Sequence, residues 1–473
     1  MVSATKSQVS ADCRTLWQSL VEAVRGTRQD FTEGSISRAV LLLATPMVLE
    51  MSMESLFAIV DMFWVSRLGA NAVATVGLTE SILSLIYSVA FGVCFSTTAM
   101  VARRVGEKDL RGAATAAVQA IALGIAVAVI MGVPGFLLAP RLLGWMGASP
   151  ALIATGHNYT RIVLGGNLAV MLLFIVNAVF RGAGDAAAAM RVLWFSNLIN
   201  LALDPCLIFG LGPFPALGVT GAAVSTLTGR SIGVVYQLWI LSRGSSRIVV
   251  RWEDVAIVPK VFFRLARVSA TGVMQGAIAT TSWVALVRII STFGSGAVAG
   301  YTIGIRVFFF FLMPAWGLSG AAATMVGQNL GAQKPARAER AVYLTGLYNM
   351  VFLGAIAALF VLAPETITGV FSGDPAVAPY AVSCLRIIGY GNLAYAFGMV
   401  MVQAFNGAGD TVTPTFINLI GFWLCEIPLA WLLAYHVGWG VRGVFAAIPI
   451  AEAFITLMGL AMFLRGGWRR RAI

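Results

Sequence analysis

Charged residues are scarce in this sequence. They make up 11% of its 473 residues, whereas a soluble domain usually contains about 25%. Only two histidines are present, His157 and His436, and they lie far apart, so we do not expect a dedicated metal site. No two cysteines have CxxC spacing, and we expect five free thiols, mostly packed as small apolar groups: Cys13, Cys94, Cys206, Cys384 and Cys425.

Several motifs of nucleotide-dependent and enzymatic chemistry are also missing. No glycine-rich turn is followed by the Lys-Ser/Thr pair of a P-loop, and no GxGxxG follows a strand pattern. We therefore expect no ATP motor within the chain and no cofactor. HExxH and GxSxG do not occur. A membrane-embedded enzyme would need a nucleophile with a base, or a metal cluster, and neither is indicated.

Long apolar runs are what the sequence does contain. Hydrophobic residues make up 59% of it, in blocks of roughly 20 residues or more, the length that a helix needs to cross a bilayer. Open sheets cannot span a bilayer, so we predict an all-α integral membrane protein with twelve transmembrane helices. The segments run approximately 39–64, 72–101, 113–137, 159–180, 187–210, 217–241, 267–291, 298–326, 341–363, 380–405, 413–436 and 441–464.

The formal charge of +12 comes from basic residues that gather in alternate loops. This pattern sets membrane orientation and does not indicate a nucleic-acid partner. It predicts a multi-pass protein of the cell (inner) membrane with both termini in the cytoplasm. The first 34 residues lack the apolar core of a signal peptide. Residues 12–25 fit either a short amphipathic surface helix or a frayed tail. The basic residues concerned lie at 103–111, 181–191, 243–264, 334–340 and 465–471.

An internal repeat divides the chain into two halves. The sequence Gly182-Ala-Gly-Asp185 recurs as Gly407-Ala-Gly-Asp410, a shift of 225 residues, and the same shift relates Gly92 to Gly317 and Gly106 to Gly331. An even number of helices per repeat gives both halves the same orientation, a plan used by transporters that rock two bundles around a site between them. We predict a tail (1–34), an N-lobe (35–242), a linker (243–266), a C-lobe (267–464) and a basic tail (465–473).

The first apolar segment contains three acids, Glu50, Glu54 and Asp61. Their spacing places them on one face of a helix. An ionisable residue in a membrane helix costs roughly 2.5–3.5 kcal/mol on insertion scales, so these acids are candidate cation-binding groups facing a cavity or the bundle interior. Pro46, a few residues earlier, predicts a kink. The kink could be a bendable, ion-sensitive gate or a static feature.

The fifth segment contains Asn200 and Asp204, four residues apart and therefore on one face. Pro205 frees a backbone carbonyl nearby. Carboxylate, amide and carbonyl oxygens suit a proton or Na⁺ rather than a soft metal, so a cation site is predicted around Asp61 and Asp204. The alternative is that Asp204 only forms hydrogen bonds inside the bundle.

The second half is poorer in acids. The shift of 225 residues places Gln275 opposite Glu50, so the acids are concentrated in the first lobe. Glu426 and Glu452 are secondary candidates for a C-lobe cation site. The aromatic run 308–311 is interpreted as packing rather than a cation cage.

Several of these runs resemble the multidrug and toxic compound extrusion (MATE) family. They are Pro46-Met-Val-Leu-Glu50, Val60-Asp-Met-Phe-Trp-Val-Ser-Arg-Leu-Gly69, Phe180-Arg-Gly-Ala-Gly-Asp185, Asn200-Leu-Ala-Leu-Asp-Pro205 and Gly218-Val-Thr-Gly-Ala-Ala223. The resemblance covers the chain after residue 34. It implies a V-shaped fold of two six-helix lobes that exports cationic or amphipathic drugs in exchange for H⁺ or Na⁺ by alternating access.

The resemblance also implies site residues. The family's N-lobe cation cluster matches Asp61, Asn200, Asp204, Asn177 and a Thr, either Thr226 or Thr220. Some members carry a Glu on the seventh helix where this chain has Gln275, which points toward the DinF-type or archaeal-like branch. Glu54 departs from the neutral residue that is common at its position. We expect drug-like small molecules and membrane lipids as partners, and a monomer.

A second class of function is a flippase for lipid-linked precursors from the same broader superfamily. Such a substrate carries pyrophosphate and favours a cationic cavity, so the acidic stripe of the first segment argues against it.

Overall fold

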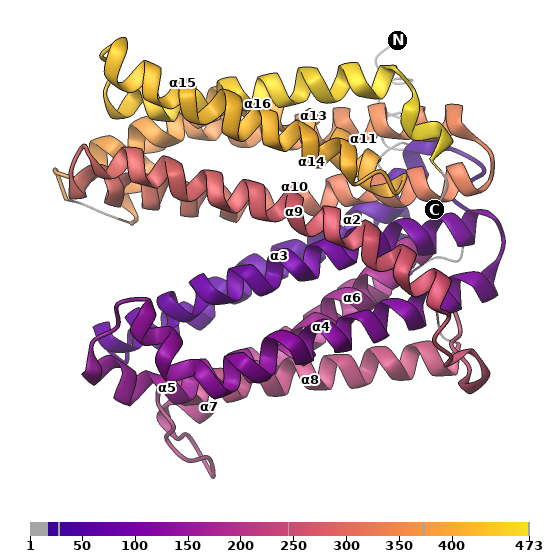
Figure 1. The fold of residues 1–473 in the computed structure, drawn as a ribbon, viewed down its shortest axis with the longest axis horizontal. Helices are drawn as coiled ribbons and strands as arrows, with labels where there is room; N and C mark the ends of the chain where they lie inside the picture. Colours follow the sequence, from indigo (N-terminus) through magenta and orange to yellow (C-terminus); the bar gives the residue numbers. More distant parts are fainter. Residues whose placement is uncertain (1–17, 27–28, 245, 372–373, 472–473) are drawn as a thin grey trace, which may run out of the picture.

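The computed structural model describes residues 18–26, 29–244, 246–371 and 374–471, and all regular structure in these ranges is helical. Two bundles form the arms of a V (Figure 1). The arms meet at one end, where the chain begins α2 and ends after α16, and they separate toward the other end. We call these the closed end and the open end. The prediction of an all-α, V-shaped, two-lobe fold is confirmed.

The first arm holds the N-lobe helices and the second holds the C-lobe helices. The N-lobe contains α2 (Ile36–Ser66), α3 (Ala70–Gly106), α4 (Leu110–Trp145), α5 (Pro150–Gly165), α6 (Asn167–Ala183), α7 (Ala186–Phe209) and α8 (Val219–Arg243). The C-lobe contains α9 (Pro259–Ser291), α10 (Ser295–Gly331), α11 (Pro335–Leu362), α12 (Pro364–Gly369), α13 (Ala378–Gly407), α14 (Val412–Asn418), η2 (Leu419–Glu426), α15 (Ile427–Trp431), η3 (Leu432–His436) and α16 (Val441–Leu464). Two short 3₁₀ turns, η1 (Trp252–Asp254) and η4 (Gly467–Arg470), flank α9 and follow α16.

Eleven spans among the described residues are long and apolar enough to cross a membrane. The twelfth predicted segment, 217–241, is helix α8, which has 25 residues but is less apolar. Arg230 and Gln237 lie in its middle and are 3% and 0% exposed. Their polar groups therefore face the interior of the N-lobe and not lipid.

Three predicted segments differ in detail from the helices observed. The segment 159–180 belongs to a longer span that is interrupted at Gly166, between α5 and α6. The segment 413–436 is not a regular α-helix, because η2 and η3 are π-helical and α15 separates them. Helix α9 begins at Pro259, within the stretch 243–266 predicted as linker, since proline is well suited to the first turn of a helix.

Part of the predicted N-terminal surface helix is present. Residues 18–25 are helical, and Ala23 is buried against the start of α2. The remainder of that prediction, including Leu16 and Trp17, lies outside the described residues, as does Cys13. The other four cysteines are free thiols.

The sequence repeat has a direct structural counterpart in glycines at which helices of the two lobes cross. A Cβ on Gly92 of α3 would lie 2.6 Å from the backbone nitrogen of Val273 in α9. A Cβ on Gly317 of α10, the equivalent residue, would lie 2.3 Å from the carbonyl oxygen of Met47 in α2. The second helix of each half thus packs on the first helix of the other half. Glycine is required at both positions because the backbones touch.

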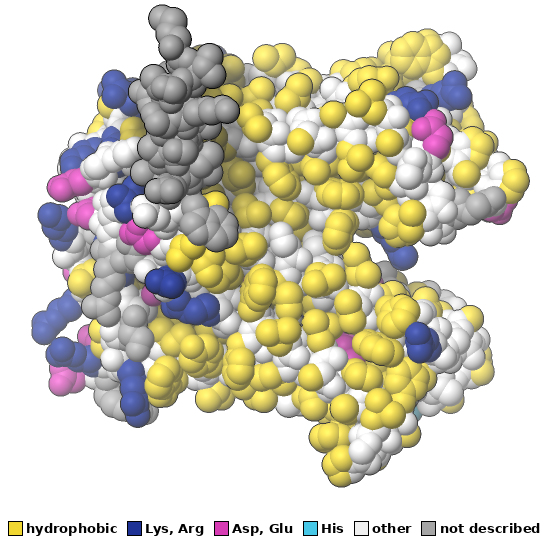
Figure 2. Space-filling model, turned by 180° about the vertical axis from the view of Figure 1, so that it is seen from behind, with side chains coloured by type: hydrophobic (Ala, Val, Ile, Leu, Met, Phe, Trp, Pro, Cys, Tyr) yellow, Lys and Arg dark blue, Asp and Glu magenta, His cyan; other side chains and the backbone are white. Residues whose placement is uncertain are grey.

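A second pair of equivalent glycines brings α3 and α10 together at the closed end. A Cβ on Gly106 would lie 2.0 Å from the carbonyl oxygen of Gln328, and one on Gly331 would lie 2.2 Å from that of Arg103. Lys and Arg side chains gather at this same end of the molecule (Figure 2).

We expect Gly106→Ala to destabilise the closed arrangement by about 1–3 kcal/mol, because the added methyl group overpacks a backbone contact. The measurement is thermal unfolding of the purified protein in detergent. Gly77→Ala on the same helix is the matched control, since a Cβ there meets nothing within 4 Å. Equal melting temperatures for the two variants would contradict the close crossing.

Candidate functional site

The acid at the deepest position of α2, Glu50, is fully buried and paired. Its Oε1 accepts hydrogen bonds from Arg181 Nη1 and Asn177 Nδ2 of α6, each at 3.0 Å. Asn177 in turn accepts a hydrogen bond from Gln237 Nε2 of α8 at 2.7 Å. Glu50 is therefore one end of a polar chain through the N-lobe, with its charge balanced by Arg181.

Glu54, one turn further along α2, is also neutralised. Its Oε1 lies 2.6 Å from Arg230 Nη2, and its Oε2 accepts a hydrogen bond from Asn197 Nδ2 at 3.0 Å. The guanidinium of Arg230 also lies 5.2 Å from the centre of the Phe57 ring, within cation–π range. A buried ion pair of this kind is costly to break, because the remaining partner becomes an uncompensated charge.

Asp61 and Asp204 form no ion pair among the described residues, unlike the two glutamates. Asp204 is fully buried, accepts a hydrogen bond from Ser225 Oγ through Oδ1, and has no partner for Oδ2. Asp61 Oδ1 is buried without a partner. Asp61 lies close enough to Asp204 for the two carboxylates to repel each other, and close enough to Arg230 to be attracted by it.

Two amide oxygens on α7 are unpaired as well. Asn200 donates a hydrogen bond to Thr226 Oγ1 at 2.9 Å, while its Oδ1 has no partner, and the same is true of Asn197 Oδ1. These two oxygens, with Asp61 Oδ1 and Asp204 Oδ2, form the oxygen cluster. Buried polar atoms without partners call for a physical explanation, and oxygen donors of this type fit a proton or a hard cation such as Na⁺.

The predicted site residues thus fall into two groups. The structure brings Asn200 into contact with Thr226, and not with the alternative Thr220. Asn177 instead contacts Glu50. Within the described ranges, no group of three or more His, Cys, Asp and Glu side chains is arranged to hold a metal ion.

A cavity of about 540 Å³ lies between the lobes. Glu50 and Arg181 line its N-lobe side, and the secondary candidates Gln275, Glu426 and Glu452 line its C-lobe side. Asp61, Asn200 and Asp204 are not among its lining residues, so the oxygen cluster and the cavity are separate places. Of the aromatic run 308–311, Phe308 and Phe309 line the cavity and Phe311 packs on Phe360.

Comparison with known proteins identifies the family. The family model MatE matches residues 46–206 and again residues 273–432, once in each lobe. This chain belongs to the MatE family. It is accordingly a membrane transporter and not an enzyme.

Full-length relatives of this MatE chain have different printed functions. A probable multidrug resistance protein NorM of Thermotoga maritima is 24% identical, over 93% of this chain and 94% of the relative. A FAD transporter of Shewanella oneidensis is 25% identical, over 92% of this chain and 95% of the relative. The solved structure of a MOP superfamily transporter from Pyrococcus furiosus has a TM-score of 0.88 at 23% identity, covering 94% of this chain and 99% of that one. The last similarity shows the fold alone.

Sequence reasoning missed several polar residues of the MatE chain's N-lobe. Arg230 and Gln237 lie in the middle of a predicted membrane helix, so the rule that singled out the acids applies to them equally. Asn197 lies one turn before Asn200, on the same face of α7. Arg181 was read only as a loop residue that sets orientation. Ser225 carries no signal in the sequence that distinguishes it from other small helix residues.

We expect Arg230→Met to destabilise the protein by about 3–5 kcal/mol, because it leaves Glu54 buried without its counter-charge. Adding Glu54→Gln should recover most of that loss. Chemical unfolding in detergent of the two single variants and the double variant measures the coupling. Arg243→Met is the control, since Arg243 is exposed near the end of the same helix. Equal losses in Arg230→Met and the double variant would show that the pair has no special role.

Proposed function

We propose that this chain is a secondary antiporter that exports cationic or amphipathic small molecules in exchange for H⁺ or Na⁺. The observation that carries the proposal is the separation of an apolar cavity between the lobes from a cluster of unpaired oxygens inside the N-lobe. One site suits an organic substrate, and the other suits a small cation. Exchange requires only that the two ligands favour different conformations of one protein.

The orientation of the proposed antiporter follows from its charge. Basic residues gather at the closed end (Figure 2), and the positive-inside rule places that end, with both termini, on the cytoplasmic side of the cell (inner) membrane. The open end then faces outward, so the cavity is accessible from the side to which an exported compound is released.

The proposed coupling acts through α2. This helix carries Asp61 and packs on α7 of the N-lobe and on α10 of the C-lobe. Repulsion between Asp61 and Asp204 falls when a proton or Na⁺ binds between them, so ion binding changes the free energy of the position that α2 takes. Pro46 lies on the same helix and removes one backbone hydrogen bond, which lowers the cost of bending there.

The oxygen cluster fits a coupling ion by its donor chemistry. Asp61, Asn200 and Asp204 would supply the oxygens for Na⁺, with Thr226 holding the Asn200 side chain in place. For a proton, either carboxylate would serve as the acceptor. Glu50 and Glu54, which are paired with arginines, would orient the surrounding helices.

The charges of the cavity lining disfavour the alternative substrates that carry pyrophosphate. Three acids, Glu50, Glu426 and Glu452, face one arginine, Arg181. This excess of negative charge opposes a lipid-linked precursor, and it opposes FAD for the same reason. The substitution of Gln275 for a seventh-helix Glu supports the DinF-type or archaeal-like branch, and we propose that the protein acts as a monomer.

We expect Asp61→Asn and Asp204→Asn each to reduce gradient-driven export at least tenfold, because neither amide can take up a proton or supply full charge to Na⁺. The measurement is ethidium accumulation in inverted membrane vesicles, with ΔpH and Na⁺ gradients imposed separately and equal protein amounts. Glu253→Gln, in the exposed turn between α8 and α9, is the control. Undiminished gradient-dependent export by both Asp variants would refute the coupling site.

A further inference from the structure

Two carboxylates on the C-lobe wall of the cavity are not balanced by any basic side chain. Glu426 is 4% exposed, and no ion pair of Glu426 or Glu452 occurs among the described residues. The two glutamates are close enough to repel each other. Arg181 is the only Lys or Arg in the cavity lining, and it is already paired with Glu50 at 3.0 Å. The C-lobe wall is therefore the negative side of the cavity.

Unpaired amide groups accompany these acids. Gln275 Oε1, Asn392 Nδ2 and Asn406 Oδ1 are buried without a hydrogen-bond partner, and all three residues line the same cavity. Gln275 and Asn392 are 7% and 1% exposed. Buried polar atoms are normally satisfied, so unpaired ones on a cavity wall are groups that a ligand can satisfy.

The rest of this wall is aromatic. Its rings belong to Trp283, Tyr301, Phe308, Phe309, Trp316 and Tyr395. Aromatic faces attract organic cations and also provide apolar contact area, whereas they give little to a small hydrated ion.

The backbone at Glu426 is unusual. Glu426 ends the π-helical segment η2, where each turn holds more residues than in an α-helix. Such segments are rare and are frequently found at functional sites. The wider turn alters which side chains of this span face inward, and it places Glu426 on the cavity wall.

We propose that Glu426 and Glu452 bind the positive charge of an amphipathic aromatic cation, with the surrounding rings holding its apolar part. This inference rests on the proposed export function and assigns the substrate's charge to the C-lobe. The coupling ion and the substrate then use different carboxylates, and no residue is shared between the two sites.

The test is equilibrium binding of radiolabelled tetraphenylphosphonium to the purified full chain in phosphatidylcholine nanodiscs without a gradient. The double variant Glu426→Gln with Glu452→Gln should bind at least tenfold more weakly, because both charges are removed with little change in shape. Glu253→Gln should bind as the unaltered protein does. Tetraphenylborate, which has the same shape and opposite charge, should compete better in the double variant than in the unaltered protein.

Unweakened tetraphenylphosphonium binding by the double variant, at an unchanged melting temperature, would overturn the site. If the double variant does not fold, each single variant is measured, and a threefold loss is expected from each. Failure of this inference is distinct from failure of the proposed function. Gradient-independent transport with intact charge-selective binding would remove the antiport proposal and leave this site in place.

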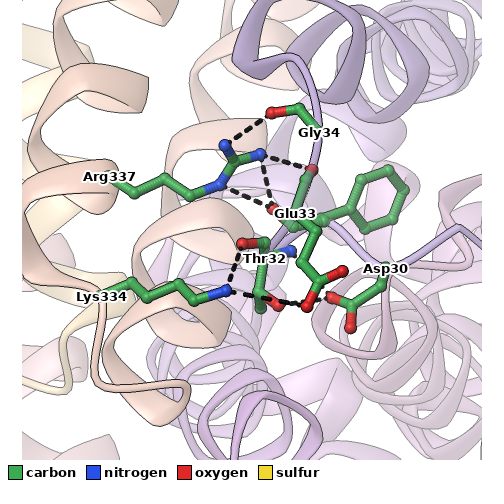
Figure 3. Close-up of polar contacts among 7 residues, drawn as sticks. Asp30, Thr32, Glu33, Gly34, Lys334 and Arg337 are labelled. Carbon is green, nitrogen blue, oxygen red and sulfur yellow. Dashed lines mark hydrogen bonds and ion pairs between the residues drawn. The ribbon is translucent and has the colours of Figure 1, made fainter.

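A second feature, independent of the cavity, lies at the closed end (Figure 3). Residues 29–35, which precede α2, form what we call the clasp. Arg337 of α11 donates hydrogen bonds to the carbonyl oxygens of Glu33 and Gly34, both at 2.7 Å, and to that of Phe31 at 3.3 Å. Lys334 Nζ donates to the carbonyl oxygen of Thr32 at 3.0 Å. The backbone of the clasp is thereby fixed to the C-lobe.

The side chain of Phe31 lies between the two lobes. It is fully buried in a cluster that includes Ala186 of the N-lobe and Met325 of the C-lobe. The guanidinium of Arg247, which follows α8, lies 5.7 Å from the centre of its ring. The clasp therefore contacts both lobes at the end where they meet.

We infer that the clasp locks the closed end, and that inward opening requires Lys334 and Arg337 to release it. The lobes cannot separate at this end while the N-lobe's first helix stays bound through its preceding backbone to α11. Because the acceptors are backbone carbonyls, the lock depends on the conformation of residues 31–34 more than on their side chains.

Spin labels at Arg111→Cys and Val412→Cys, with the native cysteines replaced by alanine, report the distance across the closed end by electron–electron double resonance. Arg337→Ala should at least double the population with a long distance, and Phe31→Ala should do the same. Arg340→Ala, an exposed arginine on the same helix, should leave the distribution unchanged. Unchanged distributions in both Arg337→Ala and Phe31→Ala would overturn the lock.

Discussion

The N-lobe depends on the pairing of α2 acids with arginines from other helices. A single charge in a membrane interior is costly, and Glu50 and Glu54 are stable there because Arg181 and Arg230 lie within 3.0 Å and 2.6 Å of them. These contacts fix α2 against α6 and α8. They also leave Asp61 as the α2 acid without an ion pair among the described residues. The low dielectric that forces the first two acids to pair is what makes the third responsive to a small ion.

The contact between the lobes is of a different kind, because it is made by backbone rather than charge. Equivalent glycines allow α3 to touch α9 and α10 to touch α2, so each lobe is packed against the first helix of the other. Small residues let membrane helices approach closely without a hydrophobic driving force. The duplication is thus more than a historical trace, since both copies of each glycine serve the same contact from opposite sides.

Much of the fold could be predicted from the sequence, since apolar length and helical period are local properties. The blocks gave twelve helices, and the constant shift gave two parallel halves. What the sequence could not give was irregularity within a span, because π-helical turns such as η2 depend on packing around them. For the site, helical spacing correctly put Glu50, Glu54 and Asp61 on one face. Their partners come from other helices, and a spacing rule cannot say that Glu54 meets Arg230 while Asp61 meets none.

The crossing of α3 and α10 at Gly106 and Gly331 has a mechanical consequence. Each of these helices has 37 residues, and the crossing lies at the last residue of both. At 1.5 Å per residue each extends about 55 Å from that point, so a rotation of about 10° moves its far end by about 10 Å. The two helices act as levers with a common fulcrum. A change of an ångström or two near the fulcrum is therefore enough to alter the width of the open end by the size of a small molecule.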